Sequence, residues 1–206
     1  MLYLDTVIIL AGGKSSRMGT DKQFMIVDNR LMIDHMIEKL KEHFKEIIIV
    51  TNKPEMYKNY PYKIVEDKVK EFGPLAGIHA GLMNSSNLYN YVLACDMPFV
   101  NFDYVYYMQS LLKDDLKGLD AVVTRFGEWL EPFNAFYSKN LIDMIEKNIR
   151  LDKRRIVTLF EESKVLYVPE SKAREFSPKW EMFMNLNTCN DFQQYMVMKE
   201  RESEWK

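Results

Sequence analysis

The chain has 206 residues, of which 47% are hydrophobic and 28% are charged. An apolar fraction of this size supports a sizeable core, which argues against a disordered protein, and the length favours one large domain. The formal net charge of −2 gives no reason to expect a nucleic-acid polymer as a partner. Two cysteines that form no CxxC pair predict neither a disulfide framework nor a zinc site.

Neither a signal peptide nor a membrane-spanning segment is visible. The first five residues lack basic side chains, and the apolar run at residues 7–10 is short and is soon followed by two glycines. No apolar window approaches the roughly 20 residues that a helix needs to cross a bilayer. We therefore expect a soluble, cytoplasmic protein without a membrane partner.

Short apolar runs alternate along the chain with segments of helical periodicity. The runs are continuous, which is typical of strands covered on both faces. They occupy residues 6–10, 46–50, 62–65, 91–95, 121–124 and 165–168. This order predicts an α/β fold, a single Rossmann-like domain over residues 1–206 with a mainly parallel central sheet flanked by helices. Residues 118–135 are expected to contain a strand that runs against the others.

The predicted helices are marked by apolar side chains at helical spacing. They are expected within residues 30–44, at 74–83, 105–112 and 141–149, and from residue 188 onward. In the first segment the apolar spacing continues as far as Phe44. The last helix begins where Thr188 and Asp191 can form a capping box.

The segment IILAGGKSSRMGTDKQF, residues 8–24, leaves the first strand for a loop rich in glycine and positive charge. In an open α/β sheet, ligands bind beyond the carboxyl ends of the strands. Backbone N–H groups at residues 12–15 could form an anion-binding concavity, and Arg17 and Lys22 add cations that bind phosphate. The spacing matches neither the Walker A motif nor the dinucleotide fingerprint. The residues alone therefore leave an ordinary strand-to-helix turn as the alternative to a phosphate site.

The string LAGGKSSRMGTDK resembles, at each defined position, the LAGGxSxRMGxDK signature of the molybdenum cofactor guanylyltransferases. Cytidylyltransferases that modify the same pterin resemble LAAGxSxRMG, and glycine in place of that second alanine favours a guanine nucleotide. The resemblance implies a nucleotidyltransferase fold whose N-terminal part binds GTP and whose C-terminal part binds the pterin acceptor. It implies GTP contacts at Leu10, Ala11, Gly12, Gly13 and Lys22. Arg17 and Lys22 would act in catalysis.

Three later segments resemble further motifs of this family, in the same order. VEDKVKEFGPLAGI places Asp67 before a GPLAGI string, and the resemblance implies that Asp67 contacts the nucleoside part of GTP. CDMPF ends a buried strand at Asp96, for which the resemblance implies a catalytic carboxylate that binds GTP and holds Mg²⁺, a cation that prefers oxygen ligands. MNLNTCNDF resembles NxNTPxxL, with Cys189 in place of proline, and implies a role for Asn185 and Asn187 in pterin binding or the transfer step. Without the family, these residues fit a charged strand end, a turn cap and loop asparagines.

Two weaker matches complete the site. Asn52 follows the second strand and matches a guanine-nucleotide contact of the family, although asparagine is common in turns. LEPFNAFY resembles the segment that lines the acceptor pocket, but its Pro132 and three aromatic residues fit an edge strand and core equally well.

The resemblance implies transfer of GMP from GTP to molybdopterin, which yields molybdopterin guanine dinucleotide and pyrophosphate. Mg²⁺ is the expected cofactor, and other cofactor-biosynthesis proteins and molybdoenzyme apoproteins are possible partners. A phosphate monoester is already anionic near neutral pH, so catalysis needs positioning and charge neutralisation rather than a general base. The alternatives are a cytidylyl- or sugar-nucleotidyltransferase of the same fold, and a catalytically silent nucleotide-binding adapter for molybdoenzyme assembly.

Overall fold

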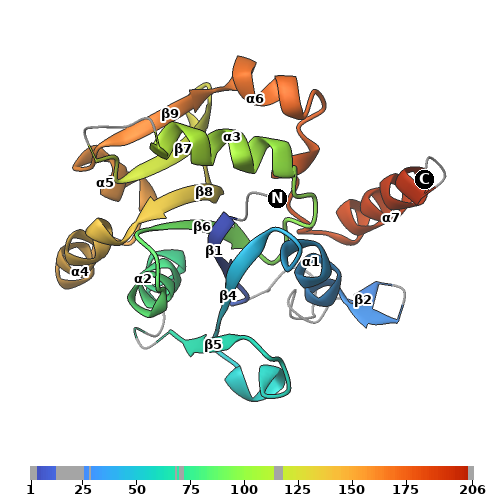
Figure 1. The fold of residues 1–206 in the computed structure, drawn as a ribbon, viewed down its shortest axis with the longest axis horizontal. Coiled ribbons are helices and arrows are strands. Elements are labelled where there is room, and N and C mark those ends of the chain that lie inside the picture. Colours follow the sequence, from blue (N-terminus) through green and yellow to red (C-terminus); the bar gives the residue numbers. More distant parts are fainter. Residues whose placement is uncertain are drawn as a thin grey trace.

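The computed structural model describes residues 4–12, 26–27, 29–67, 69, 72–113 and 118–203. In this part of the chain a seven-stranded sheet, in the order β5-β4-β1-β6-β8-β7-β9, has helices on both faces (Figure 1). The strands are β1 (Leu4–Leu10), β4 (Phe44–Thr51), β5 (Lys63–Glu66), β6 (Tyr89–Ala94), β7 (Ala121–Phe126), β8 (Trp129–Ser138) and β9 (Val165–Pro169). The predicted α/β fold with a mainly parallel sheet is confirmed.

One strand of this sheet, β8, runs against both of its neighbours. Val92 of β6 pairs with Ala135 of β8, and Phe136 of β8 pairs with Val122 of β7, in both cases antiparallel. The other pairings in the sheet are parallel; they join β5 with β4, β4 with β1, β1 with β6, and β7 with β9. The predicted reversed strand is therefore present. The edge-strand alternative for LEPFNAFY is wrong, because β8 lies inside the sheet between β6 and β7.

The helices divide between the two faces of the sheet. They are α1 (Met32–Leu40), α2 (Pro74–Asn84), α3 (Phe102–Lys113), α4 (Ile142–Arg150), α5 (Ile156–Glu161), α6 (Glu170–Phe176) and α7 (Cys189–Ser203). Buried apolar side chains of α3, α6 and most of α1 belong to one core, and those of α2, α4 and α5 belong to another; Met32 of α1 packs in a third, smaller cluster with Leu186. Figure 1 shows α2 and α4 next to each other on the side of the sheet opposite α3. No helix in the described residues is long and apolar enough to cross a membrane.

The first helix ends earlier than its apolar spacing predicts. It stops at Leu40, a turn occupies residues 41–43, and Phe44 is the first residue of β4. Phe44 is nevertheless buried in the same core as α1, with its ring 5.7 Å from that of Tyr91. Its burial belongs to the strand and coincides with the helical spacing. Two further short strands, β2 (Ile26–Val27) and β3 (Arg30–Leu31), form a hairpin before α1.

Polar side chains near the amino ends of the central strands satisfy one another. Thr6 Oγ1 donates to Glu46 Oε2 at 2.7 Å and accepts from Asn87 Nδ2 at 2.9 Å. Ser85 Oγ donates to Asn90 Oδ1, and both side chains are buried. This network links the end of α2 to the start of β6 and has an evident structural role.

Helix α2 packs on the sheet at close range, because two of its residues lack a side chain. A methyl group added at Gly81 would lie 2.9 Å from Cδ1 of Ile8 and closer still to its Cγ2. A methyl group added at Gly77 would lie 3.3 Å from Cδ2 of Leu10. Of these two glycines, Gly81 therefore leaves less room for a side chain.

We expect Gly81→Ala to lower the free energy of unfolding by about 1–3 kcal/mol, because overpacking outweighs the better helix propensity of alanine. Urea denaturation of purified protein measures this difference. Gly77→Ala is the matched control, since its methyl meets only the end of a flexible side chain, and its effect should be smaller. Equal stability of the Gly81→Ala variant and the wild type would contradict the packing argument.

Candidate active site

The carboxyl end of β1 is held between the ends of β4 and β6 by main-chain hydrogen bonds. The Ala11 N–H donates to the Val50 carbonyl at 2.8 Å, and the Cys95 N–H donates to the Leu10 carbonyl at 3.1 Å. These two bonds bring the segments that follow the three strands to one edge of the sheet. The side chains of Leu10 and Ala11 are buried. A ligand at this edge would therefore meet these residues mainly through their main chain.

Gly12 and Asn52 face each other where β1 and β4 end. Both residues are exposed. A methyl group built on Gly12 would lie 3.9 Å from the backbone nitrogen of Asn52, the nearest described atom, which is an ordinary contact. Packing of the described residues therefore does not require glycine at this position. A ligand that approaches the backbone provides a reason for it.

Asp96 lies two residues after the end of β6 and is partly exposed. Its carbonyl accepts a hydrogen bond from the N–H of Leu186, a buried residue, at 2.8 Å. Asn185 and Asn187 flank Leu186 and are partly exposed and exposed, respectively. The structure thus brings both predicted asparagines to the strand end that carries Asp96.

The predicted capping box is confirmed at the start of α7. Asp191 Oδ2 accepts from the N–H groups of Asn187 and Thr188 at 2.9 and 2.8 Å, and Thr188 Oγ1 accepts from the Asp191 N–H at 3.1 Å. The cap fixes the chain immediately after the two asparagines. The presence of Cys189 where the family has proline does not prevent it.

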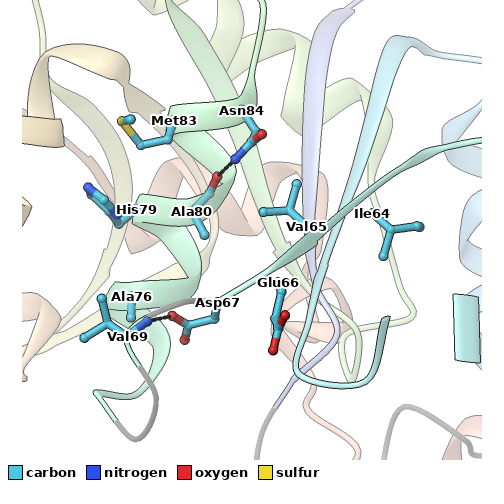
Figure 2. A pocket seen from close by; sticks show the side chains of 10 residues that line it. All are labelled: Ile64, Val65, Glu66, Asp67, Val69, Ala76, His79, Ala80, Met83 and Asn84. Carbon is cyan, nitrogen blue, oxygen red and sulfur yellow. Dashed lines mark hydrogen bonds between the residues drawn. The ribbon is translucent and has the colours of Figure 1, made fainter. Parts of the chain in front are cut away.

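A pocket of about 360 Å³ lies between β5 and α2 (Figure 2). Asp67, which follows β5, borders it near the start of α2, and His79 and Asn84 line it further along the helix. Figure 2 shows the Asp67 carboxyl directed toward Val69, whose N–H donates to Asp67 Oδ1 at 2.9 Å. His79 Nε2 lies 3.2 Å from Oε1 of Glu146 on α4. The pocket therefore offers a carboxylate at the same edge of the sheet, one strand beyond Asn52.

Burial raises the pKa of the Asp67 carboxyl above its ordinary value, while the Val69 N–H and the nearby His79 act in the opposite direction. Ionised Asp67 therefore lacks part of the solvation that it would have in water. A ligand that donates hydrogen bonds to this carboxylate would replace the missing water.

The remaining predicted residues Gly13, Arg17 and Lys22 lie outside the described residues. In the described part of the chain, no group of three or more His, Cys, Asp or Glu residues is placed to hold a metal ion. Asp96 is thus a single carboxylate at a partly exposed strand end. This suits Mg²⁺, which is commonly held by one or two carboxylates together with substrate phosphates and water.

No sequence motif marks His79 or Glu131. His79 lines the pocket because it lies one helical turn from Ala76, but a lone histidine on a helix carries no motif. Glu131 lies in the segment LEPFNAFY, and its position depends on the reversal of β8. The antiparallel register pairs Leu93 with Asn134. The residues of β8 that precede Asn134, Glu131 among them, therefore lie toward the carboxyl end of β6.

Residues 7–165 match the family model described as the MobA-like NTP transferase domain. The match spans most of the chain and includes the strand ends that carry Gly12, Asn52, Asp67 and Asp96. The protein belongs to the MobA-like NTP transferase domain family.

Within this family, the chain is similar to proteins whose names refer to the molybdenum cofactor or to molybdopterin. The chain is 44% identical over 200 residues to a protein of Peptoclostridium acidaminophilum named "Probable molybdenum cofactor guanylyltransferase", covering 96% of this chain and 90% of that protein. It is 45% identical over 190 residues to the molybdenum cofactor guanylyltransferase of Syntrophotalea carbinolica, covering 92% and 90%. The crystal structure of molybdopterin-guanine dinucleotide biosynthesis protein A from Archaeoglobus fulgidus superposes with a TM-score of 0.83 at 26% identity, covering 95% of this chain and 99% of that one.

The raised pKa of Asp67 predicts a stability effect with a definite sign. The folded state binds this proton more tightly than the unfolded state, so ionisation of Asp67 makes the free energy of unfolding fall as the pH rises through the acidic range. Asp67→Asn carries no charge and can still accept from the Val69 N–H. We therefore expect the variant to be at least as stable as the wild type at pH 7, with a flatter pH profile between acid and neutral pH.

Urea denaturation across this pH range tests the prediction. Glu55→Gln is the control, because Glu55 is an exposed carboxylate that does not line the pocket. A clear loss of stability of Asp67→Asn at pH 7, with an unchanged Glu55→Gln variant, would contradict the prediction.

Proposed function

We propose that this protein transfers GMP from GTP to molybdopterin, forming molybdopterin guanine dinucleotide and releasing pyrophosphate. The observation that carries the proposal is the meeting of Gly12, Asn52, Asp96 and Asn187 at one edge of the sheet. This edge is where α/β proteins bind nucleotides. The two relatives named as guanylyltransferases support the choice of reaction over a cytidylyl- or sugar-nucleotidyltransferase and over a silent adapter.

On the nucleotide side, the backbone of residues 10–12 and Asn52 would contact the base and ribose. Asp67 would accept hydrogen bonds from the nucleoside, which offsets the cost of burying its charge. From their places in the LAGGxSxRMGxDK string, Arg17 and Lys22 would bind the triphosphate. Arg forms bidentate contacts with phosphate, and Lys acts as a point charge.

On the transfer side, the terminal phosphate of the acceptor attacks the α-phosphorus of GTP. The bond from this phosphorus to the oxygen that bridges to the β-phosphate breaks, and pyrophosphate leaves. Asp96 would hold Mg²⁺, which neutralises charge on phosphate oxygens when it is bound. Asn185 and Asn187 would orient the acceptor or the transferred phosphate with their amides. The cytoplasm is the setting we infer, with molybdoenzyme apoproteins and other cofactor-biosynthesis proteins as possible partners.

A nucleotide panel tests the function directly. Wild-type protein is incubated with molybdopterin, Mg²⁺ and either GTP, CTP, ATP or UTP, and dinucleotide products are identified by mass. We expect product with GTP. Gly12→Ala should keep its stability, because the added methyl makes only an ordinary contact, but should lose part of the preference for GTP. A product formed only with CTP, or no product and no pyrophosphate, would refute the proposed function.

Asp96→Asn should lower turnover with GTP by at least about 100-fold, because the carboxylate charge needed at the phosphates is lost. The fold should survive, since the bond that holds Leu186 uses the main-chain carbonyl of residue 96. Pyrophosphate release measures turnover, and circular dichroism checks the fold. Asp143→Asn, which removes an exposed carboxylate from α4, is the control. Full Mg²⁺-dependent turnover of Asp96→Asn would exclude Asp96 as the metal ligand.

A further inference from the structure

Asn134 of β8 is a polar side chain in an apolar part of the core. It is 1% exposed and pairs across the sheet with Leu93 of β6, which is fully buried. Leu93 and the nearby Phe136 belong to the core that includes α3 and α6. A buried amide costs free energy unless it is hydrogen-bonded, and an apolar side chain at this position would avoid that cost. The hydrogen bonds of Asn134 therefore need a reason.

The Asn134 amide joins the sheet to the segment between α6 and α7, residues 177–188. Its Nδ2 donates to the Met182 carbonyl at 3.0 Å, and its Oδ1 accepts from the Tyr91 hydroxyl on β6 at 2.6 Å. Met182 and Tyr91 are buried as well. Because a carbonyl can only accept, the amide nitrogen has to face Met182, and the hydroxyl then holds the amide oxygen. Tyr91 therefore orients the amide, and the amide holds the segment.

The backbone of this segment is strained just before Met182. Trp180 has φ 70° and ψ 19°, in the left-handed region, which is a true outlier for a bulky side chain. Such a conformation persists only where the surrounding structure holds it. The carbonyls of Trp180 and Glu181 accept from N–H groups of the same turn, at 3.1 and 2.9 Å. Of these three consecutive carbonyls, that of Met182 is the one held by a side chain of the sheet.

The segment is attached to the sheet a second time, four residues further on. The Leu186 N–H donates to the Asp96 carbonyl at 2.8 Å. Asp96 comes three residues after Leu93, the residue that pairs with Asn134. The two hydrogen bonds therefore attach residues 182 and 186 near the carboxyl end of β6. The two asparagines assigned to the acceptor lie on either side of the second attachment.

We propose that Asn134 is a positioning residue for the transfer reaction. Its amide, oriented by Tyr91, sets the path of the segment that brings the two acceptor asparagines to Asp96. Asn134 is too deeply buried to contact the acceptor itself, so it acts through the segment. The proposal rests on the proposed function for the reaction, but the attachment concerns this segment alone.

Asn134→Leu removes both hydrogen bonds and keeps the branching of the side chain. We expect kcat to fall by at least about tenfold, with KM for GTP within about twofold, because misplacement of a substrate-orienting group by about 1 Å can cost up to about 100-fold in rate. Pyrophosphate release with GTP and molybdopterin measures both constants.

Asn90→Leu is the matched control. Asn90 is also buried in the sheet, donates from Nδ2 to the Asn87 carbonyl at 3.1 Å and accepts from the Ser85 hydroxyl, but it lies at the opposite edge. Its kcat should stay within about twofold of the wild type, because the substrate-orienting groups are not displaced. A loss of kcat in Asn90→Leu as large as that in Asn134→Leu would overturn the proposal.

A double variant separates positioning from stability. In Asn134→Leu the Tyr91 hydroxyl is buried without its acceptor, which adds to the loss of stability. Tyr91→Phe combined with Asn134→Leu removes this hydroxyl, so the double variant should regain part of the lost stability in urea. Its kcat should stay as low as that of Asn134→Leu, because the Met182 carbonyl still lacks the amide. Recovery of turnover together with stability would overturn the proposal.

A second background tests the route of the effect. Residues that act as one unit give non-additive losses. When Asn185 and Asn187 are both replaced by alanine, Asn134→Leu should therefore add little further loss of kcat. Losses that multiply would show that Asn134 acts by another route and would refute the proposal.

Amide hydrogen exchange tests the attachment without reference to catalysis, because it reports local opening. We expect faster exchange across residues 183–187 in Asn134→Leu and, to a smaller extent, in Tyr91→Phe, with wild-type exchange there in Asn90→Leu. Unchanged exchange in the first two variants would refute the proposal. If Asn134→Leu does not fold, Tyr91→Phe decides by the same exchange and kcat measurements. A wild-type protein that forms no dinucleotide would refute the proposed function, while exchange would still decide whether Asn134 holds the segment.

Discussion

Parallel pairing of β1 with β4 on one side and β6 on the other determines where the site can form. The Ala11 and Cys95 N–H groups donate to carbonyls on neighbouring strands. The segments that follow β1, β4 and β6 therefore lie side by side at one edge of the sheet. Loop side chains that are distant in sequence therefore meet at one edge. These bonds are made by the main chain, which makes the arrangement independent of the side chains that perform the chemistry. Strand β5, paired in the same sense with β4, extends this edge to Asp67.

The reversal of β8 completes the site from the other direction. Because β8 is antiparallel to β6, its first residues rather than its last lie toward the edge that carries Asp96. The segment after α6 is held by the side chain of Asn134 on β8 and by the Asp96 carbonyl. The parallel strands thus carry the residues assigned to the nucleotide, and β8 with the returning segment carries those assigned to the acceptor.

Much of this architecture could be predicted from the sequence, because continuous apolar runs and helical spacing reflect burial directly. The runs at residues 6–10 and 91–95 became central strands, and Asn187 and Asp96 were both identified by motifs. Their contact through Leu186 could not be derived, because a main-chain hydrogen bond leaves no side-chain pattern. The left-handed backbone of Trp180 also has no signal, since glycine or asparagine would be expected there. The prediction that the first helix extends to Phe44 was wrong for a different reason. Phe44 is buried at helical spacing from α1, but it belongs to β4.

The order of strands in space has a consequence for the growing chain on the ribosome. Strands β1, β4, β5 and β6 are contiguous in the sheet and precede β7, β8 and β9 in the sequence. Synthesis from the N-terminus makes this four-stranded block available for pairing before the rest of the sheet exists. The hydrogen bond from Leu186 to Asp96 joins a segment made after all seven strands to the end of a strand made early, so the acceptor side of the site forms only after the whole sheet has been synthesised.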